Sequence, residues 1–157
     1  MIDQKNKRLL KDINEVGCLF LCLANMTEEL FSYQFEPEQL NAVWEMAVKR
    51  GYIVNRETKD PDGILKMLKE VTKTESEKRI FQIGQTLNGF TQYWGWVKDK
   101  HKERIFTMAM EKTGGTIGTH FILVKSYAEP VITYDSWTLS RAGQKTNTQR
   151  FIYYGVV

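Results

Sequence analysis

The pattern of apolar residues divides the chain into a helical first half and a strand-rich second half. The segment Cys18–Phe31 is apolar on most sides, which predicts a buried central helix. Apolar residues at helical spacing predict a helix within residues 36–51 and another after the turn at 60–63, where Asp62 is the expected cap. Residues 9–15 fit a short amphipathic helix or a loop.

The second half carries short apolar runs of the kind that form strands. They lie at residues 79–84, 104–110, 120–125, 131–134 and 150–154. An aromatic-rich segment at residues 90–97 is expected to be a helix, and residues 113–119 form a glycine-rich loop. Helices followed by antiparallel strands predict an α+β fold, with a central N-terminal helix packed on a C-terminal antiparallel sheet.

Composition is that of an ordinary globular domain. The chain has 157 residues, of which 42% are hydrophobic, and a formal net charge of +3. We therefore expect a single domain over residues 1–157. The charge is too balanced to indicate nucleic-acid binding by itself. No apolar run is long enough to span a bilayer and no signal peptide is recognisable, so we expect a soluble, cytoplasmic protein, although release by lysis or dedicated export leaves no mark in the sequence.

The cysteines and histidines restrict the chemistry. Cys18 and Cys22 lie one helical turn apart, and the histidines are His101 and His120. This set lacks the spacing of a disulfide framework or of a structural zinc site, so we expect no metal and no cofactor. Cys22 sits within the apolar helix and is expected to be a core residue.

Three residues from the two ends of the chain form a candidate thiol-hydrolase site. Cys18 opens the buried helix, where the helix N-terminus and a nearby imidazolium favour the reactive thiolate. His120 opens one predicted strand and Asp135 follows the next. If those strands are antiparallel neighbours, His120 and Asp135 lie at the same edge of the sheet, and Asp135 can orient the imidazole. The backbone N–H of Cys18 can bind an oxyanion, and Gly17 leaves room for a substrate.

Each of these residues also has a structural interpretation. Cys18 can be a core thiol, His120 a solvent-facing loop residue, and Asp135 the start of an Asx turn. Trp137 either forms a wall of the cleft or packs in the core. Aromatic and basic residues at 93–104 are either a stacking platform for nucleic acid or glycan, or a buried aromatic face followed by a solvated turn; the second interpretation is favoured.

Two segments carry a resemblance to a known family. The runs His120-Phe-Ile-Leu-Val-Lys-Ser-Tyr and Val-Ile-Thr-Tyr-Asp135-Ser-Trp137 resemble the histidine and Asp-Pro-Trp segments of papain-like cysteine peptidases of the bacteriocin-processing (C39-like) type. The family also places its cysteine at the start of a central N-terminal helix. The resemblance implies a papain-like fold, with Cys18 as nucleophile, His120 as general base and acid, and Asp135 as the residue that orients His120.

The sequence departs from this family pattern in three places. The family has a glutamine about six residues before the cysteine to complete the oxyanion hole, but this chain has Asp12, so Asn14 is the nearest candidate amide. Glycine precedes Cys18 rather than following it, and Ser136 replaces the family's proline. The middle of the chain, about residues 31–112, carries no part of the resemblance.

The resemblance implies a small bacterial or phage cysteine hydrolase whose partner is a peptide or protein substrate. It would cleave a peptide or isopeptide amide, such as that of a cell-wall stem peptide. The alternative is a papain-like binding or inhibitory module without catalysis, which the missing upstream glutamine favours.

Overall fold

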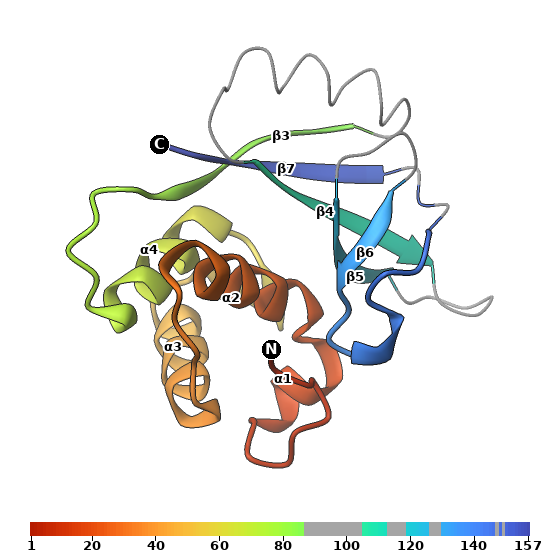
Figure 1. Ribbon diagram of the computed structural model, residues 1–157. Coiled ribbons are helices and arrows are strands. Elements are labelled where there is room, and N and C mark those ends of the chain that lie inside the picture. Colours follow the sequence, from red (N-terminus) through yellow and green to blue (C-terminus); the bar gives the residue numbers. More distant parts are fainter. Residues whose placement is uncertain (87–104, 113–118, 126–129, 147, 149) are drawn as a thin grey trace.

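The computed structural model describes residues 1–86, 105–112, 119–125, 130–146, 148 and 150–157. Within these residues, helices pack against an antiparallel sheet, so the predicted α+β class is confirmed (Figure 1). The helices are α1 (Lys11–Val16), α2 (Cys18–Phe31), α3 (Pro37–Lys49) and α4 (Pro61–Thr72).

The sheet contains five strands in the order β3-β7-β4-β5-β6, and all neighbouring pairs are antiparallel. Its strands are β3 (Ile80–Thr86), β4 (Ile105–Lys112), β5 (Thr119–Lys125), β6 (Val131–Tyr134) and β7 (Arg150–Val156). A separate hairpin joins β1 (Ile53–Val54) to β2 (Glu57–Thr58), and a 3-10 turn, η1 (Leu139–Arg141), follows β6. The C-terminal strand β7 thus lies inside the sheet, between β3 and β4.

Helix α2 has the bounds that its apolar pattern predicts, and it lies at the centre of the molecule (Figure 1). It packs against α4 on one side and against β5 on the other. Its end is set by Ser32, which adopts the left-handed conformation that commonly closes a helix. Because α2 is covered on both sides, its sequence needs almost no polar stripe.

The caps of α3 and α4 show how local sequence sets the helix starts. Glu36 and Gln39 form a reciprocal capping box at α3. At α4 the cap is Asp60, whose carboxylate accepts from Gly63 N at 2.9 Å, so the expected cap at Asp62 is wrong. Asp62 lies in the first turn, where it accepts from the backbone N–H of Gln82 at 2.8 Å and ties α4 to β3.

Two apolar clusters lie on the two faces of the sheet. The larger one joins α1–α4 to residues such as Met108, Leu123 and Tyr154. The smaller one contains Ala109, Ile122, Val124, Ile132, Phe151 and Tyr153. Since neighbouring residues of β5 belong to different clusters, the strand has both faces buried and its sequence is a continuous apolar run.

Several sequence expectations fall outside the described residues. These are the helix at 90–97, the basic aromatic cluster at 93–104 and the glycine-rich loop at 113–119, of which only Thr119, the first residue of β5, is described. Among the helices that are described, none combines the length and apolar character needed to cross a bilayer.

The junction between α1 and α2 depends on Gly17. A Cβ at this position would lie 2.6 Å from the backbone oxygen of Ile13 and 2.7 Å from its side chain. The backbone of Gly17 has an ordinary negative φ of −84°, so the requirement is for space rather than for an unusual conformation. Ile13 itself is completely buried, which leaves it little room to move.

We predict that Gly17→Ala destabilises the fold by about 1–3 kcal/mol, because the added methyl overpacks against a buried backbone carbonyl. Urea unfolding followed by circular dichroism measures this cost. The matched control is Val16→Ala, which shortens an exposed side chain at the neighbouring position and should change the free energy of unfolding by less than about 0.5 kcal/mol. Equal stability of the two variants would contradict the packing argument.

Candidate active site

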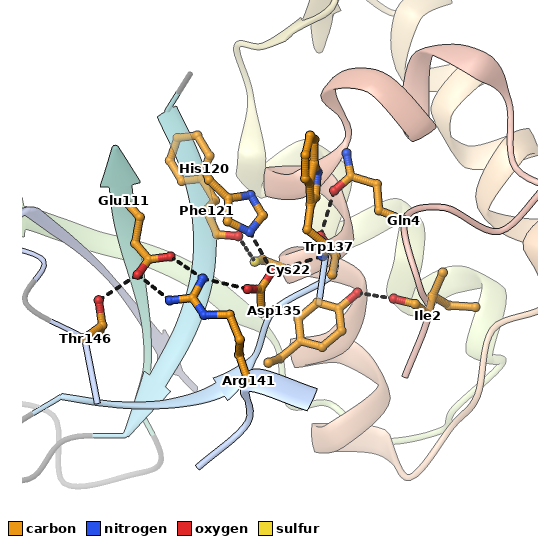
Figure 2. A network of polar contacts seen from close by, with 12 residues as sticks. Ile2, Gln4, Cys22, Glu111, His120, Phe121, Asp135, Trp137, Arg141 and Thr146 are labelled. Carbon is orange, nitrogen blue, oxygen red and sulfur yellow. Dashed lines mark hydrogen bonds and ion pairs between the residues drawn. The ribbon is translucent and has the colours of Figure 1, made fainter. Parts of the chain in front are cut away.

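The sheet brings His120 and Asp135 together at one edge. Strands β5 and β6 are antiparallel neighbours, and Leu123 pairs with Tyr134. His120 near the start of β5 and Asp135 just after β6 therefore lie side by side. His120 Nε2 is 2.6 Å from Asp135 Oδ1, and the two side chains are 6% and 1% exposed (Figure 2). A short, buried contact of this kind fixes the orientation of the imidazole ring.

Asp135 has further partners that hold its carboxylate in place. The backbone N–H of Trp137 donates to Oδ1 at 3.0 Å, and Arg141 Nη1 donates to Oδ2 at 2.9 Å (Figure 2). The Trp137 contact is an Asx turn, so the structural and the functional interpretations of Asp135 hold together. Each carboxylate oxygen accepts at least one charged donor or backbone N–H.

Cys18 is the first residue of α2 and is 8% exposed. Its thiol lies close enough to the imidazole of His120 to raise the pKa of that group. Because Asp135 engages Nε2, Nδ1 is the ring nitrogen left for Cys18. Gly17, the N-cap of α2, has no side chain to cap the first turn, and the N–H of Cys18 has no acceptor within its own helix.

Opposing effects set the charge of His120. Burial acts to lower its pKa, but the contacts with Asp135 and Cys18 outweigh burial and raise the pKa from 6.5 to about 9. Burial acts to raise the pKa of Asp135, but His120, the Trp137 N–H and Arg141 lower it overall. Because folding raises the pKa of His120, its charge stabilises the fold fully below about pH 6.5, and this contribution is lost as the pH rises through about 9.

Sequence reasoning missed a second layer behind Asp135. Arg141 donates from Nη1 and Nη2 to the two oxygens of Glu111 at 2.9 and 2.8 Å. Thr146 Oγ1 donates to Glu111 Oε2 at 2.8 Å. Glu111 in β4 is the cross-strand partner of His120 in β5, so both side chains rise from the same face of the sheet (Figure 2). Only the strand register and the fold of residues 135–146 reveal this arrangement.

The N-terminal segment ties the helices to the strand end that carries Asp135. Gln4 is fully buried; its backbone N–H donates to Ser136 O at 2.8 Å, and its side-chain oxygen accepts from Ser136 Oγ at 2.8 Å. Its amide nitrogen donates to Ile13 O and Asn14 O at 3.0 and 3.2 Å. Tyr134 Oη donates to Ile2 O at 2.6 Å. Gln4 thus joins the helix before Cys18 to the residue after Asp135.

Asn14 is not placed as the sequence analysis expected. Its amide donates to Gln4 O at 2.5 Å and to Asn6 O at 2.9 Å. Both N–H groups of the amide are therefore used to hold the N-terminal loop, and neither is free for an oxyanion. Asp12, at the position of the family's glutamine, is at the surface and pairs with Arg56 at 3.3 Å.

The remaining predicted residues have distinct environments. Trp137 is 47% exposed, and its ring centroid is 5.8 Å from that of His120, so it lies beside the site. The absence of a side chain at Gly17 is explained by the close packing of Ile13. Cys22 is fully buried, donates to Phe121 O at 3.4 Å, and burial raises the pKa of its thiol well above the ordinary value. Cys22 is a core thiol.

The described residues thus form an α+β protein with a buried cysteine–histidine–aspartate constellation at the sheet edge. The chain belongs to the family described as "Protein of unknown function, DUF261", whose model matches residues 1–153. No curated protein and no solved structure matches the chain. Within the described ranges, no group of three or more histidine, cysteine and acidic side chains is arranged to bind a metal ion.

We predict that the imidazole of His120 titrates near pH 9. Nuclear magnetic resonance of histidine ring nuclei in a His101→Gln background isolates its signal, because the sequence has two histidines. Asp135→Asn should move the midpoint down by at least about one pH unit, since the neutral amide removes the carboxylate charge. A midpoint near 6.5 in the parent protein would contradict the described contacts.

We also predict that Gln4→Ala lowers the free energy of unfolding by about 2–4 kcal/mol, because it removes the side-chain partner of Asn14 O and of the Ser136 hydroxyl and one of the two donors to Ile13 O. Denaturant unfolding measures the loss. Gln34→Ala is the control, since Gln34 is exposed and the same truncation there should cost under about 0.5 kcal/mol. Similar stabilities for both variants would show that the N-terminal segment does not hold the fold together.

Proposed function

We propose that this protein is a papain-like cysteine hydrolase that cleaves a peptide or isopeptide amide. The observation that carries the proposal is the 2.6 Å contact between His120 and Asp135, with the Cys18 thiol on the imidazole at the start of α2. In this proposal Cys18 is the nucleophile, His120 is the base beside it, and Asp135 orients His120, which is the arrangement that nucleophilic catalysis requires. No cofactor is needed for this reaction.

The charge of the imidazole supports a nucleophilic role for Cys18. A cationic imidazole favours a thiolate, and the thiolate is the form that attacks a carbonyl carbon. In the first step, a bond forms between Cys18 Sγ and the carbonyl carbon while the carbonyl oxygen takes up the negative charge. His120 then gives its proton to the leaving nitrogen, the C–N bond breaks and a thioester remains. Water deprotonated by His120 hydrolyses the thioester and releases the carboxylic acid and the thiol.

The backbone N–H of Cys18 supplies one donor for the oxyanion. It belongs to the first turn of α2, where N–H groups lack acceptors within the helix and the helix dipole is positive. Asn14 does not supply a second donor, because its amide is bound to Gln4 and Asn6. Backbone N–H donation at a helix start is the part of the oxyanion hole that the described residues support.

The substrate is a peptide or protein amide, and a cell-wall stem peptide is the first class to test. This choice extends the papain-like resemblance of the His120 and Asp135 segments. The exposed ring of Trp137 beside His120 offers an apolar wall for a substrate side chain next to the reacting bond.

One observation favours a second function, that of a papain-like binding or inhibitory module without catalysis. The amides of Gln4 and Asn14 both donate to backbone carbonyls, so neither nearby amide serves an oxyanion. With a single backbone donor, the tetrahedral intermediate loses stabilisation of about 3 kcal/mol, by the usual cost of one missing oxyanion donor. Such a protein would retain the Cys18–His120–Asp135 geometry but bind a peptide without cleaving it.

We predict that a peptidyl vinyl sulfone, which mimics a peptide substrate, labels Cys18 and leaves Cys22 unmodified. Mass spectrometry of the digested protein locates the adduct. Cys18→Ser should abolish labelling and His120→Ala should slow it by at least about 100-fold, because the base contributes about that much in general acid–base catalysis. Cys22→Ser is the matched control, in which labelling should persist.

The two functions give different results in this experiment and in a turnover assay. Labelling of Cys18 together with hydrolysis of stem peptides or isopeptide-linked peptides supports the hydrolase. Labelling without hydrolysis, with tight binding of the peptides, supports the non-catalytic module. A folded protein whose Cys18 resists the probe, or reacts equally fast without His120, would contradict the proposed hydrolase.

A further inference from the structure

A row of positively and negatively charged side chains in contact with one another extends from the candidate site along the sheet edge. The imidazole of His120 contacts the carboxylate of Asp135, which contacts the guanidinium of Arg141, which contacts the carboxylate of Glu111. The separations are 2.6 Å for the first pair and 2.8–2.9 Å for the others. Thr146 closes the row on the far side of Glu111.

We infer that Arg141 is a positioning residue of the proposed hydrolase, which fixes the carboxylate of Asp135 against His120 and is itself held in place by Glu111. The inference rests on the proposed function and deepens it. Arg141 touches neither the thiol nor the imidazole, so its effect on the reaction passes through Asp135.

The guanidinium has the geometry that this role needs. Its planar, rigid group places two parallel N–H donors on the two oxygens of Glu111, and Nη1 also reaches Asp135 Oδ2. Asp135 Oδ1 is left for His120 Nε2 and the Trp137 N–H. Lysine has a single ammonium group and lacks this fork, so it can replace the charge of Arg141 but not its orientation.

Glu111 holds the guanidinium, and the strand register fixes its position. It is opposite His120 in the β4–β5 pair, and Thr146 donates to the same Oε2 that accepts from Arg141. Arg141 is one-third exposed and belongs to the short turn η1, so this ion pair, rather than burial in the core, keeps it in place. The register therefore places Glu111, which holds Arg141, beside the imidazole of His120.

The surrounding charges set the direction of the expected pH effects. The charged or titratable groups that act on His120 and Asp135 come from α2, β4, β6 and η1; they are Cys18, Cys22, Glu111, Tyr134 and Arg141. Arg141 lowers the pKa of Asp135, so its removal raises that pKa. Glu111 and His120 attract each other, so the removal of Glu111 lowers the pKa of His120.

The test compares Arg141→Gln, Arg141→Lys and Glu111→Gln in the His101→Gln background. The first readout is the downfield proton resonance of the hydrogen bond between His120 and Asp135, followed against pH. The second is the rate constant for alkylation of Cys18 by iodoacetamide at neutral pH. Arg56→Gln is the matched control, because Arg56 also bridges two carboxylates, those of Asp12 and Glu15 in α1.

The acid limit is the pH below which the resonance of the hydrogen bond between His120 and Asp135 is lost. We predict that Arg141→Gln raises this acid limit by about one pH unit and slows Cys18 alkylation by about tenfold. Arg141→Lys should restore the acid limit but only part of the rate, because it keeps the charge and loses the fork. Glu111→Gln should lower the midpoint of His120 titration. Arg56→Gln should leave the resonance, the midpoint and the rate unchanged, even if it lowers the melting temperature.

A folded Arg141→Gln protein with an unchanged resonance and a rate within about twofold of the parent would overturn the positioning role, since a misplaced group costs far more than that. If Arg141→Gln does not fold, Arg141→Lys and Glu111→Gln decide the question by the same two readouts. Failure of the proposed function is distinguishable: Cys18 of the parent would then resist the peptidyl probe, while the resonance of His120 would still report on Arg141.

Discussion

The hydrogen bond between His120 and Asp135 is the interaction on which the rest of the candidate site depends. Both side chains are buried, so an unpaired carboxylate or imidazolium at this position would be costly. Further contacts offset the cost of this burial. The Trp137 N–H and Arg141 donate hydrogen bonds to the carboxylate of Asp135, and the Cys18 thiol is a further partner of the imidazole. Buried charged groups carry a desolvation penalty, and a network of them is more typical of a functional site than of a core that contributes only stability.

The site joins the two ends of the chain, and its geometry therefore depends on how they are fastened together. Cys18 is supplied by the helical half, and His120 and Asp135 come from the sheet. Helix α2 packs directly on β5. In the N-terminal segment, the side chain of Gln4 binds both Ile13 in α1 and Ser136 after β6. Small shifts between these halves would separate thiol from imidazole, so Gln4 and Gly17 contribute to the site although they carry no chemistry.

Local sequence patterns predicted the elements well. The apolar run that forms α2 and the apolar strands β5 and β6 are where they were expected, because burial on most sides leaves a strong signal. From the antiparallel pairing of those strands, the proximity of His120 and Asp135 also followed. The sequence did not identify the correct cap of α4, because the aspartates on either side of Pro61 both fit the local pattern of a cap and only the geometry selects Asp60.

Contacts between distant segments could not be predicted in the same way. Arg141 lies in a turn without periodicity, and Glu111 becomes its partner only through the register of β4 against β5. Asn14 was a reasonable donor by position, but a loop closed by Gln4 and Asn6 uses its amide. Polar side chains in loops have several acceptors within reach, and the fold, not the local sequence, selects among them.

A crystal structure of the adduct between the protein and a peptidyl vinyl sulfone would show whether Cys18, His120 and Asp135 act together as a catalytic site. We expect a covalent bond from Cys18 Sγ to the probe, His120 Nδ1 within about 4 Å of that sulfur, and Asp135 still bound to Nε2. An unmodified Cys18 in probe-saturated crystals, or an imidazole turned away from the sulfur, would contradict it.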